Sequence, residues 1–65
     1  MSKDEVIIEL AARDSISFEK AKKILEDAAA RIQPLVKDKT GIDTAFEIWE
    51  YEIGLPPEHM FEVIL

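Results

Sequence analysis

The fold of this chain is decided by residues 17–33, which read SFEKAKKILEDAAARIQ. Apolar side chains recur there every three or four residues, a spacing that aligns them along one side of an α-helix. They are Phe18, Ala21, Leu25, Ala28 and Ile32, with Ile24 and Ala29 widening the stripe and Val36 continuing it past the stretch. Ser17 stands just before the stripe and is suited to cap the first turn. The stretch therefore predicts a helix over residues 18–33 that buries one side.

Pro34 directly follows this helix. A proline has no N–H to donate, and its ring crowds the carbonyl four residues earlier. We therefore expect the helix to stop or bend near Ile32. Gly41 predicts the end of a short separate segment over residues 35–40.

A second helix is predicted before this stretch, over residues 3–13. Ser2 and Glu5 form a capping box, in which each side chain can bond to the backbone of the other residue. Apolar residues at helical spacing follow the box and share one face; they are Val6, Ile7, Leu10 and Ala11. The polar pair Asp14-Ser15 is expected to end the helix.

The last third of the chain predicts two more helices. Asp43 or Thr44 can cap a helix over residues 44–53 that ends at Gly54, and Thr44 with Glu47 forms a further capping box. Pro56-Pro57 is expected to open a helix over residues 57–64, because proline is tolerated in a first turn. The inward residues would be Phe46, Trp49 and Ile53 on the first helix, and Met60, Phe61, Ile64 and Leu65 on the second.

An alternative for the same region is a β-hairpin. Residues 49–53 alternate between apolar and acidic and are rich in aromatic and β-branched side chains, as strands are. Pairing of residues 46–53 with 59–65 would make the fold α+β. We favour an all-α class, a single domain of three to four short helices in a small bundle, because strands need partners that the rest of the chain does not offer.

Size and composition restrict what the chain can be. A chain of 65 residues buries only roughly 60% of its unfolded surface. Small domains are often stabilised further by disulfides, metals or self-association, and this chain has no cysteine. A homodimer is therefore an open possibility. Its apolar runs are at most three residues long, so we expect no membrane span and no secretory signal, and a cytoplasmic location.

Charge is distributed unevenly along the chain. Its formal net charge is -6, yet residues 1–41 are neutral, with eight Lys or Arg and eight Asp or Glu. Residues 42–65 hold the other six acids and four of the five aromatic residues, without any Lys or Arg. Binding nucleic acid requires basic residues, so this segment is not expected to do so. It is either a solvated face or an acidic surface that attracts a basic protein partner.

Candidate contact residues come mainly from this acidic segment. Ile48 and Tyr51 are expected to point away from the apolar stripe of their helix, and Ile8 does the same on the first helix. Trp49 is expected in the core, yet aromatic residues also anchor interfaces. Single exposed apolar residues are normal, so these positions are either incidental or part of an interface with a partner or a second copy. The candidates are Ile8, Glu47, Ile48, Trp49, Glu50 and Tyr51.

Residues for catalysis or metal binding are scarce. His59 is the only histidine, and with Glu58 and Glu62 it lacks the ligand spacing of known metal motifs. The two glycines fall at helix ends rather than in a phosphate-binding loop. We therefore expect a binding protein rather than an enzyme, without catalytic residues, cofactor, metal or small-molecule substrate.

Three stretches of the first half of the chain carry a resemblance to a known family: Ser2–Ala11, Ile16-Ser17 and Ala21–Leu25. Together they resemble the opening of the HU/IHF family of bacterial nucleoid proteins. The resemblance covers residues 1–33 and implies a helical hairpin and a tendency to dimerise. The family's basic DNA-embracing arm has no counterpart, so no DNA-binding residue is implied.

Residues Glu9–Arg13, Ile16-Ser17 and Ile24-Leu25 also resemble a helix-turn-helix. That likeness implies a rival function, a small DNA-binding regulator. Its contacts would be Lys20, Lys22 and Lys23, although Glu19, Glu26 and Asp27 balance their charge.

The ending of the chain, Glu47-Ile48 and Ile53–Phe61, is similar to the C-terminal segments of small phage and prophage proteins. This likeness implies an accessory protein of a mobile element. A structural component of a larger assembly, such as a virion, is a third hypothesis.

Overall fold

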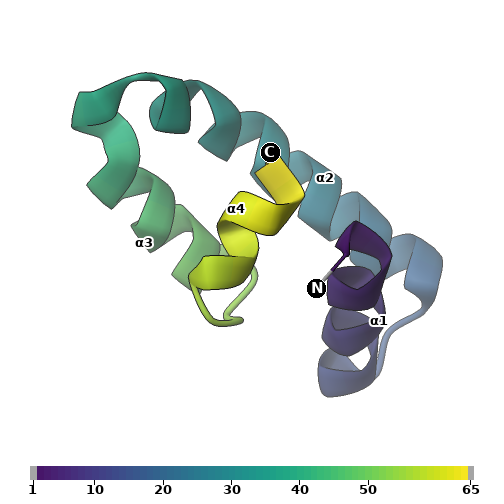
Figure 1. The fold of residues 1–65 in the computed structure, drawn as a ribbon. Helices are drawn as coiled ribbons and strands as arrows, with labels where there is room; N and C mark the ends of the chain where they lie inside the picture. Colours follow the sequence, from purple (N-terminus) through teal and green to yellow (C-terminus); the bar gives the residue numbers. More distant parts are fainter. Residues whose placement is uncertain (1, 65) are drawn as a thin grey trace.

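The computed structural model describes residues 2–64, apart from the side chain of Lys39, as four α-helices and a short 3-10 helix (Figure 1). The elements are α1 (Lys3–Asp14), α2 (Phe18–Lys37), η1 (Lys39–Gly41), α3 (Ile42–Glu52) and α4 (Glu58–Ile64). The described residues contain no strand, which confirms the all-α prediction.

The long helix α2 contacts every other helix of the described chain. In Figure 1, α1 lies beside its N-terminal half and α3 beside its C-terminal half, with α4 between them. The short α4 contacts both α1 and α2. The result is an elongated domain of 34 × 20 × 18 Å.

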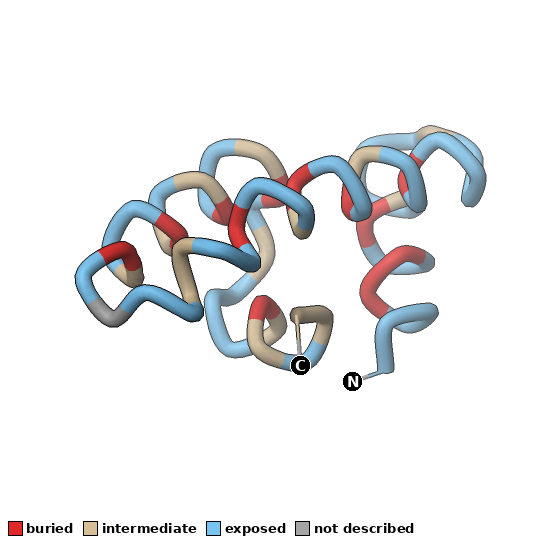
Figure 2. Tube along the Cα trace, turned by 90° about the horizontal axis from the view of Figure 1, so that it is seen from above, coloured by how far each residue is buried: buried red, intermediate tan, exposed pale blue. Residues whose placement is uncertain are grey.

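The core follows the apolar stripe of α2. The stripe residues Ala21, Leu25, Ala28 and Ile32 are fully buried, as predicted, whereas Phe18 at the start of the helix is 40% exposed. Figure 2 shows the buried positions of the helices in red. The other buried residues are Val6, Ile7, Leu10, Ala45, Trp49, Ile53 and Met60. Each large side chain buried in this way contributes about 1.5–3 kcal/mol.

Two serines cap the first two helices as the sequence predicts. The Ser2 hydroxyl accepts a hydrogen bond from the N–H of Glu5 (3.3 Å), and the Glu5 carboxylate accepts one from the N–H of Ser2 (3.2 Å). The Ser17 hydroxyl accepts from the N–H of Lys20 (3.1 Å). Between them, Ser15 ends α1 in the left-handed conformation, with a φ of 55°.

The expected stop of α2 before Pro34 is wrong. The helix continues through Pro34 to Lys37, so residues 35–37 do not form a separate segment. Ala30 and Pro34 lie on the exposed side of α2, where water can bond to the carbonyl that loses its N–H partner. Leu35 and Val36 pack against the core on the other side. That burial offsets the missing hydrogen bond.

The expected start of α3 is also wrong, since the helix begins at Ile42. Its N-terminal cap is Gly41, so Asp43 and Thr44 lie in the first turn and the capping box of Thr44 is not formed. Gly41 packs closely on the preceding helix: a Cβ there would lie 2.8 Å from the Leu35 carbonyl oxygen. The residue that caps α3 therefore has no room for a side chain unless the backbone of Leu35 moves.

The hairpin alternative is excluded, because residues 46–52 and 59–64 are helical. Trp49 and Ile53, four residues apart, are both 1% exposed, whereas Tyr51 between them is 89% exposed. In α4, Met60 is buried and Phe61 and Ile64 pack against the core, as expected. Leu65 lies outside the described residues.

Candidate functional site

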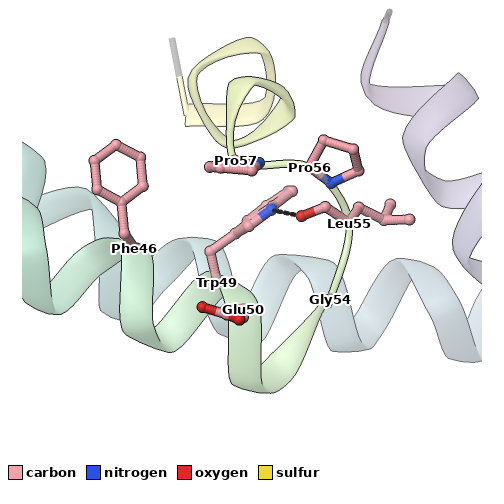
Figure 3. A pocket seen from close by; sticks show the side chains of 7 residues that line it. All are labelled: Phe46, Trp49, Glu50, Gly54, Leu55, Pro56 and Pro57. Carbon is pink, nitrogen blue, oxygen red and sulfur yellow. Dashed lines mark hydrogen bonds between the residues drawn. The ribbon is translucent and has the colours of Figure 1, made fainter.

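A pocket of about 400 Å³ lies where α3 ends and the chain turns towards α4. Figure 3 shows its lining from close by. Three lining residues belong to α3 and four to the turn that follows; they are Phe46, Trp49, Glu50, Gly54, Leu55, Pro56 and Pro57. The pocket is therefore built from one continuous stretch of chain.

Trp49 joins the two parts of this stretch. Its indole is buried, and the indole N–H donates a hydrogen bond to the carbonyl oxygen of Leu55 at 2.8 Å (Figure 3). Gly54 makes the sharp turn between them with a φ of 74°, and its N–H bonds to the Trp49 carbonyl at 2.9 Å. A positive φ is readily adopted by glycine. The turn is thereby held against the indole.

The walls of the pocket are apolar and well supported. The ring of Phe46 stands on one side, with Trp49 and the two prolines on the other (Figure 3). Phe46 contacts Phe61 of α4 edge to face, with ring centroids 5.8 Å apart. The carbonyl oxygens of Pro56 and Pro57 accept hydrogen bonds from the first N–H groups of α4, at 3.1 and 3.0 Å. The prolines are therefore anchored as well as rigid.

The only ionisable side chain in the lining is Glu50. Glu47 lies one turn earlier on α3, Glu58 follows the prolines, and all three are exposed. Among the described residues none of the three forms an ion pair with a Lys, Arg or His. The carboxylate in the lining, and the two that neighbour the lining in the sequence, are thus not neutralised by a basic side chain of the described residues.

Two arginines from the front half approach this region, and both are already paired. Arg31 of α2 bonds to Glu52 of α3 at 2.7 Å. Arg13 of α1 lies against Gly54, since a Cβ on that glycine would be 2.8 Å from its guanidinium. Arg13 bonds Asp14 through two nitrogens, at 2.9 and 3.1 Å. Asp14 therefore offsets the charge of Arg13.

The candidate contact residues differ in their exposure and in their position relative to the pocket. Glu47, Glu50 and Tyr51 are exposed on α3, and Tyr51 is almost fully accessible. Trp49 lies in the core, as expected from the apolar stripe of its helix. Because it is buried, it offers little surface to a partner. Ile8 is 57% exposed but belongs to α1 and does not line the pocket.

The expectation that Ile48 points away from the core is wrong. Its side chain is partly buried and packs against the core cluster. The buried stripe of α3 is centred on Ala45 and Trp49 rather than on Phe46. Ile48 lies three residues after Ala45 and so shares that side of the helix.

The lysines of the DNA-binding hypothesis are all exposed on the first half of α2. Lys20 and Lys23 share one side of the helix, because they are three residues apart. Lys22 is turned by about 200° from Lys20, at 100° per residue. The three lysines therefore do not form a single basic face.

The turn residues of the pocket were not predicted as site residues. Leu55, Pro56 and Pro57 appear in the sequence as a helix stop and a helix start. The signal that could have revealed them is a Gly-Leu-Pro-Pro turn directly after an aromatic helix. Such a turn folds rigid apolar groups back onto the aromatic side chains.

Residues 2–64 also bear on two other kinds of feature, metal-binding clusters and membrane-spanning helices. Within residues 2–64, no three His, Asp or Glu side chains converge on a place that could hold a metal ion. No helix in that range combines the length and apolar composition needed to cross a membrane. Comparisons of the chain with protein families, with curated proteins and with solved structures found no match.

Proposed function

We propose that this chain is a protein-interaction module that binds a basic segment of a partner protein through α3 and the turn that follows it. The observation that carries the proposal is a pocket with apolar walls and one carboxylate in its lining, Glu50, that is unpaired among the described residues. Apolar pockets with a few placed polar groups are the usual form of a binding site. The pattern of charge indicates what kind of partner would fit.

Charge complementarity favours a basic partner. Residues 42–65 contain six acids without any Lys or Arg; of these, Glu52 forms an ion pair with Arg31 and Glu62 bonds to the ring of His59. The other four, Asp43, Glu47, Glu50 and Glu58, are left to attract positive charge from outside. Such a surface steers a basic partner into place and repels acidic competitors.

Tyr51 adds an exposed aromatic ring to the surface of α3. Its side chain is 89% exposed, although tyrosine carries a large apolar ring. Tyrosine is enriched among the residues that contribute most to protein interfaces. A partner that covers Tyr51 would bury this ring on the helix that also carries Glu47 and Glu50.

The proposal is tested by retention of partners from a cell lysate on immobilised protein. The test variant reverses two charges of α3, Glu47→Lys with Glu50→Lys. The matched control makes the same charge change at exposed positions of α1 and α2, Glu9→Lys with Glu19→Lys. Circular dichroism confirms that both variants stay helical.

The expected result is a protein retained by the wild-type chain and by the control but lost from the α3 variant. Retention of the same proteins by all three would refute the proposal. Loss from both variants alike would also refute it, since the effect would then be one of net charge.

A small DNA-binding regulator is the second candidate. The observation in its favour is that Lys20 and Lys23 share an exposed side of α2, next to the tight turn between α1 and α2. Binding would depend strongly on salt, because lysines displace the counterions of DNA. A gel-shift assay with duplex DNA at low salt decides, and the absence of a shift excludes it.

A further inference from the structure

Two side chains in the lining of the pocket can form hydrogen bonds, those of Trp49 and Glu50, and only the acceptor, Glu50, is free to bond to a ligand. The indole N–H of Trp49 is the one side-chain donor of the lining, and the Leu55 carbonyl occupies it. The Glu50 carboxylate accepts hydrogen bonds and donates none when ionised. Proline has no N–H, and the N–H of Gly54 bonds to the Trp49 carbonyl. Among the lining side chains, a ligand therefore finds a free acceptor and no free donor.

The walls require the same ligand to have an apolar part. Phe46 stands on one side and Pro57 on the other, and Glu50 belongs to the same lining, one turn after Phe46 on α3 (Figure 3). The volume of about 400 Å³ lies near the lower end of the range for small-ligand sites. It suits one long side chain with its neighbouring backbone.

We infer that this pocket binds the side chain of an arginine presented by a protein partner. Its methylene groups lie between Phe46 and Pro57, and its guanidinium donates hydrogen bonds to the Glu50 carboxylate. The inference rests on the proposed function for the protein source of the arginine. Arg13, the nearest cation, does not prevent binding, because its guanidinium is already bonded to Asp14 through two nitrogens.

Arginine fits the pocket better than lysine for three physical reasons. Its planar guanidinium has five donors and matches a carboxylate with two parallel hydrogen bonds. It can stack on the face of an aromatic ring such as Phe46. It is also more weakly hydrated than an ammonium group, so that less is lost when it leaves water.

The test is a titration of the full-length, isotope-labelled chain followed by nuclear magnetic resonance. The probe is an acetylated and amidated pentapeptide with arginine at its centre and glycine elsewhere. Two matched peptides carry lysine or citrulline, an uncharged analogue of arginine, at the same position. Because Trp49 is the only tryptophan, its indole N–H gives a single signal that reports on the wall of the pocket.

The expected result is saturable movement of the Trp49 indole and Gly54 signals with the arginine peptide, with a dissociation constant in the range of about 1 mM. The lysine peptide is expected to bind about threefold more weakly, and the citrulline peptide about tenfold more weakly. Equal binding of the arginine and lysine peptides would overturn the assignment to arginine. Absence of movement at both signals would overturn the site.

Two variants distinguish binding of the arginine inside the pocket from a general attraction between the acidic surface of α3 and the positively charged peptide. Glu50→Gln and Glu47→Gln each remove one exposed carboxylate from α3, but only Glu50 lines the pocket. Affinity for the arginine peptide is expected to fall about fivefold for Glu50→Gln and less than about twofold for Glu47→Gln. Equal losses would overturn the inference, because the attraction would then not depend on the pocket.

Failure of this inference can be told from failure of the proposed function. If the peptide does not bind but a partner is retained in a manner that depends on Glu47 and Glu50, the arginine assignment is wrong and the interaction module stands. If the peptide binds as expected but no protein is retained, the pocket is right and the proposed function is wrong.

Discussion

The indole N–H of Trp49 donates a hydrogen bond to the carbonyl oxygen of Leu55, 2.8 Å away. This single bond joins the buried centre of α3 to the turn that forms the far wall of the pocket. Trp49 is the largest of the fully buried side chains. Stability of the domain and shape of the pocket therefore depend on the same residue.

Replacement of Trp49 by phenylalanine is expected to destabilise the domain by about 1–3 kcal/mol. The change removes the donor that bonds to Leu55 and leaves a void beside the smaller ring. Urea unfolding followed by circular dichroism measures the loss. Tyr51→Phe is the matched control: its side chain is exposed, so its effect should stay within about 0.5 kcal/mol. Equal stability of the two variants would show that the bond contributes nothing.

Gly41→Ala is expected to cost about 1–3 kcal/mol through overpacking. The new Cβ would lie 2.8 Å from the carbonyl oxygen and 3.0 Å from the Cα of Leu35, and backbone atoms cannot easily move aside. The φ of Gly41 is -96°, which alanine adopts without strain, so the cost would come from contact alone. Thermal unfolding measures it.

Thr44→Ala is a control for this interpretation of the start of α3. Thr44 is exposed in the first turn of the helix, and the N-terminal cap of α3 is Gly41. We expect a change within about 0.5 kcal/mol. A loss of about 1 kcal/mol, as for the removal of a capping side chain, would indicate that Thr44 caps the helix after all.

Two nearby serines are expected to respond in opposite ways. Ser15 has a φ of 55°, and glycine avoids the steric cost of that conformation. Ser15→Gly should therefore stabilise the domain by about 0.5–1 kcal/mol. Ser17→Ala removes the oxygen that caps α2 and should destabilise it by about 0.5–2 kcal/mol. Urea unfolding of both variants checks the pair, and a loss of stability in Ser15→Gly would contradict the prediction.

Acid is expected to weaken the cap of α1. Two hydrogen bonds from Ser2 hold the pKa of the Glu5 carboxyl below its ordinary value of 4.5. The larger effect comes from the backbone N–H of Ser2 and the smaller from its hydroxyl. Since the folded pKa is the lower one, the ionised carboxylate stabilises the folded state above about 4.5. This contribution is lost as the pH falls through the folded pKa.

The test compares the free energy of unfolding of the wild type with that of Glu5→Gln across this range. Glutamine keeps the acceptor but does not titrate. The advantage of the wild type is expected at neutral pH and should shrink as the solution is acidified below the ordinary pKa. A difference that stays constant with pH would show that the charge of Glu5 does not contribute.

The local rules of helix capping and helix periodicity predict most of the helical structure. Ser2 and Ser17 cap α1 and α2 because each cap depends on residues only three apart in the chain. The stripe of α2 predicts its buried face for the same reason. The acidity of the last third follows from composition alone.

Contacts between distant atoms decide the rest. Helix α2 passes through Pro34, with Leu35 and Val36 packed against the core, and Gly41 at the start of α3 lies close to the backbone of Leu35. Periodicity extends the apolar stripe to Val36, but it does not contain the close approach of Gly41 to Leu35. The pocket exists only once Gly54 turns the chain back onto Trp49. The acids of α3 were therefore predictable as a surface, whereas the pocket that Glu50 lines comes from tertiary packing.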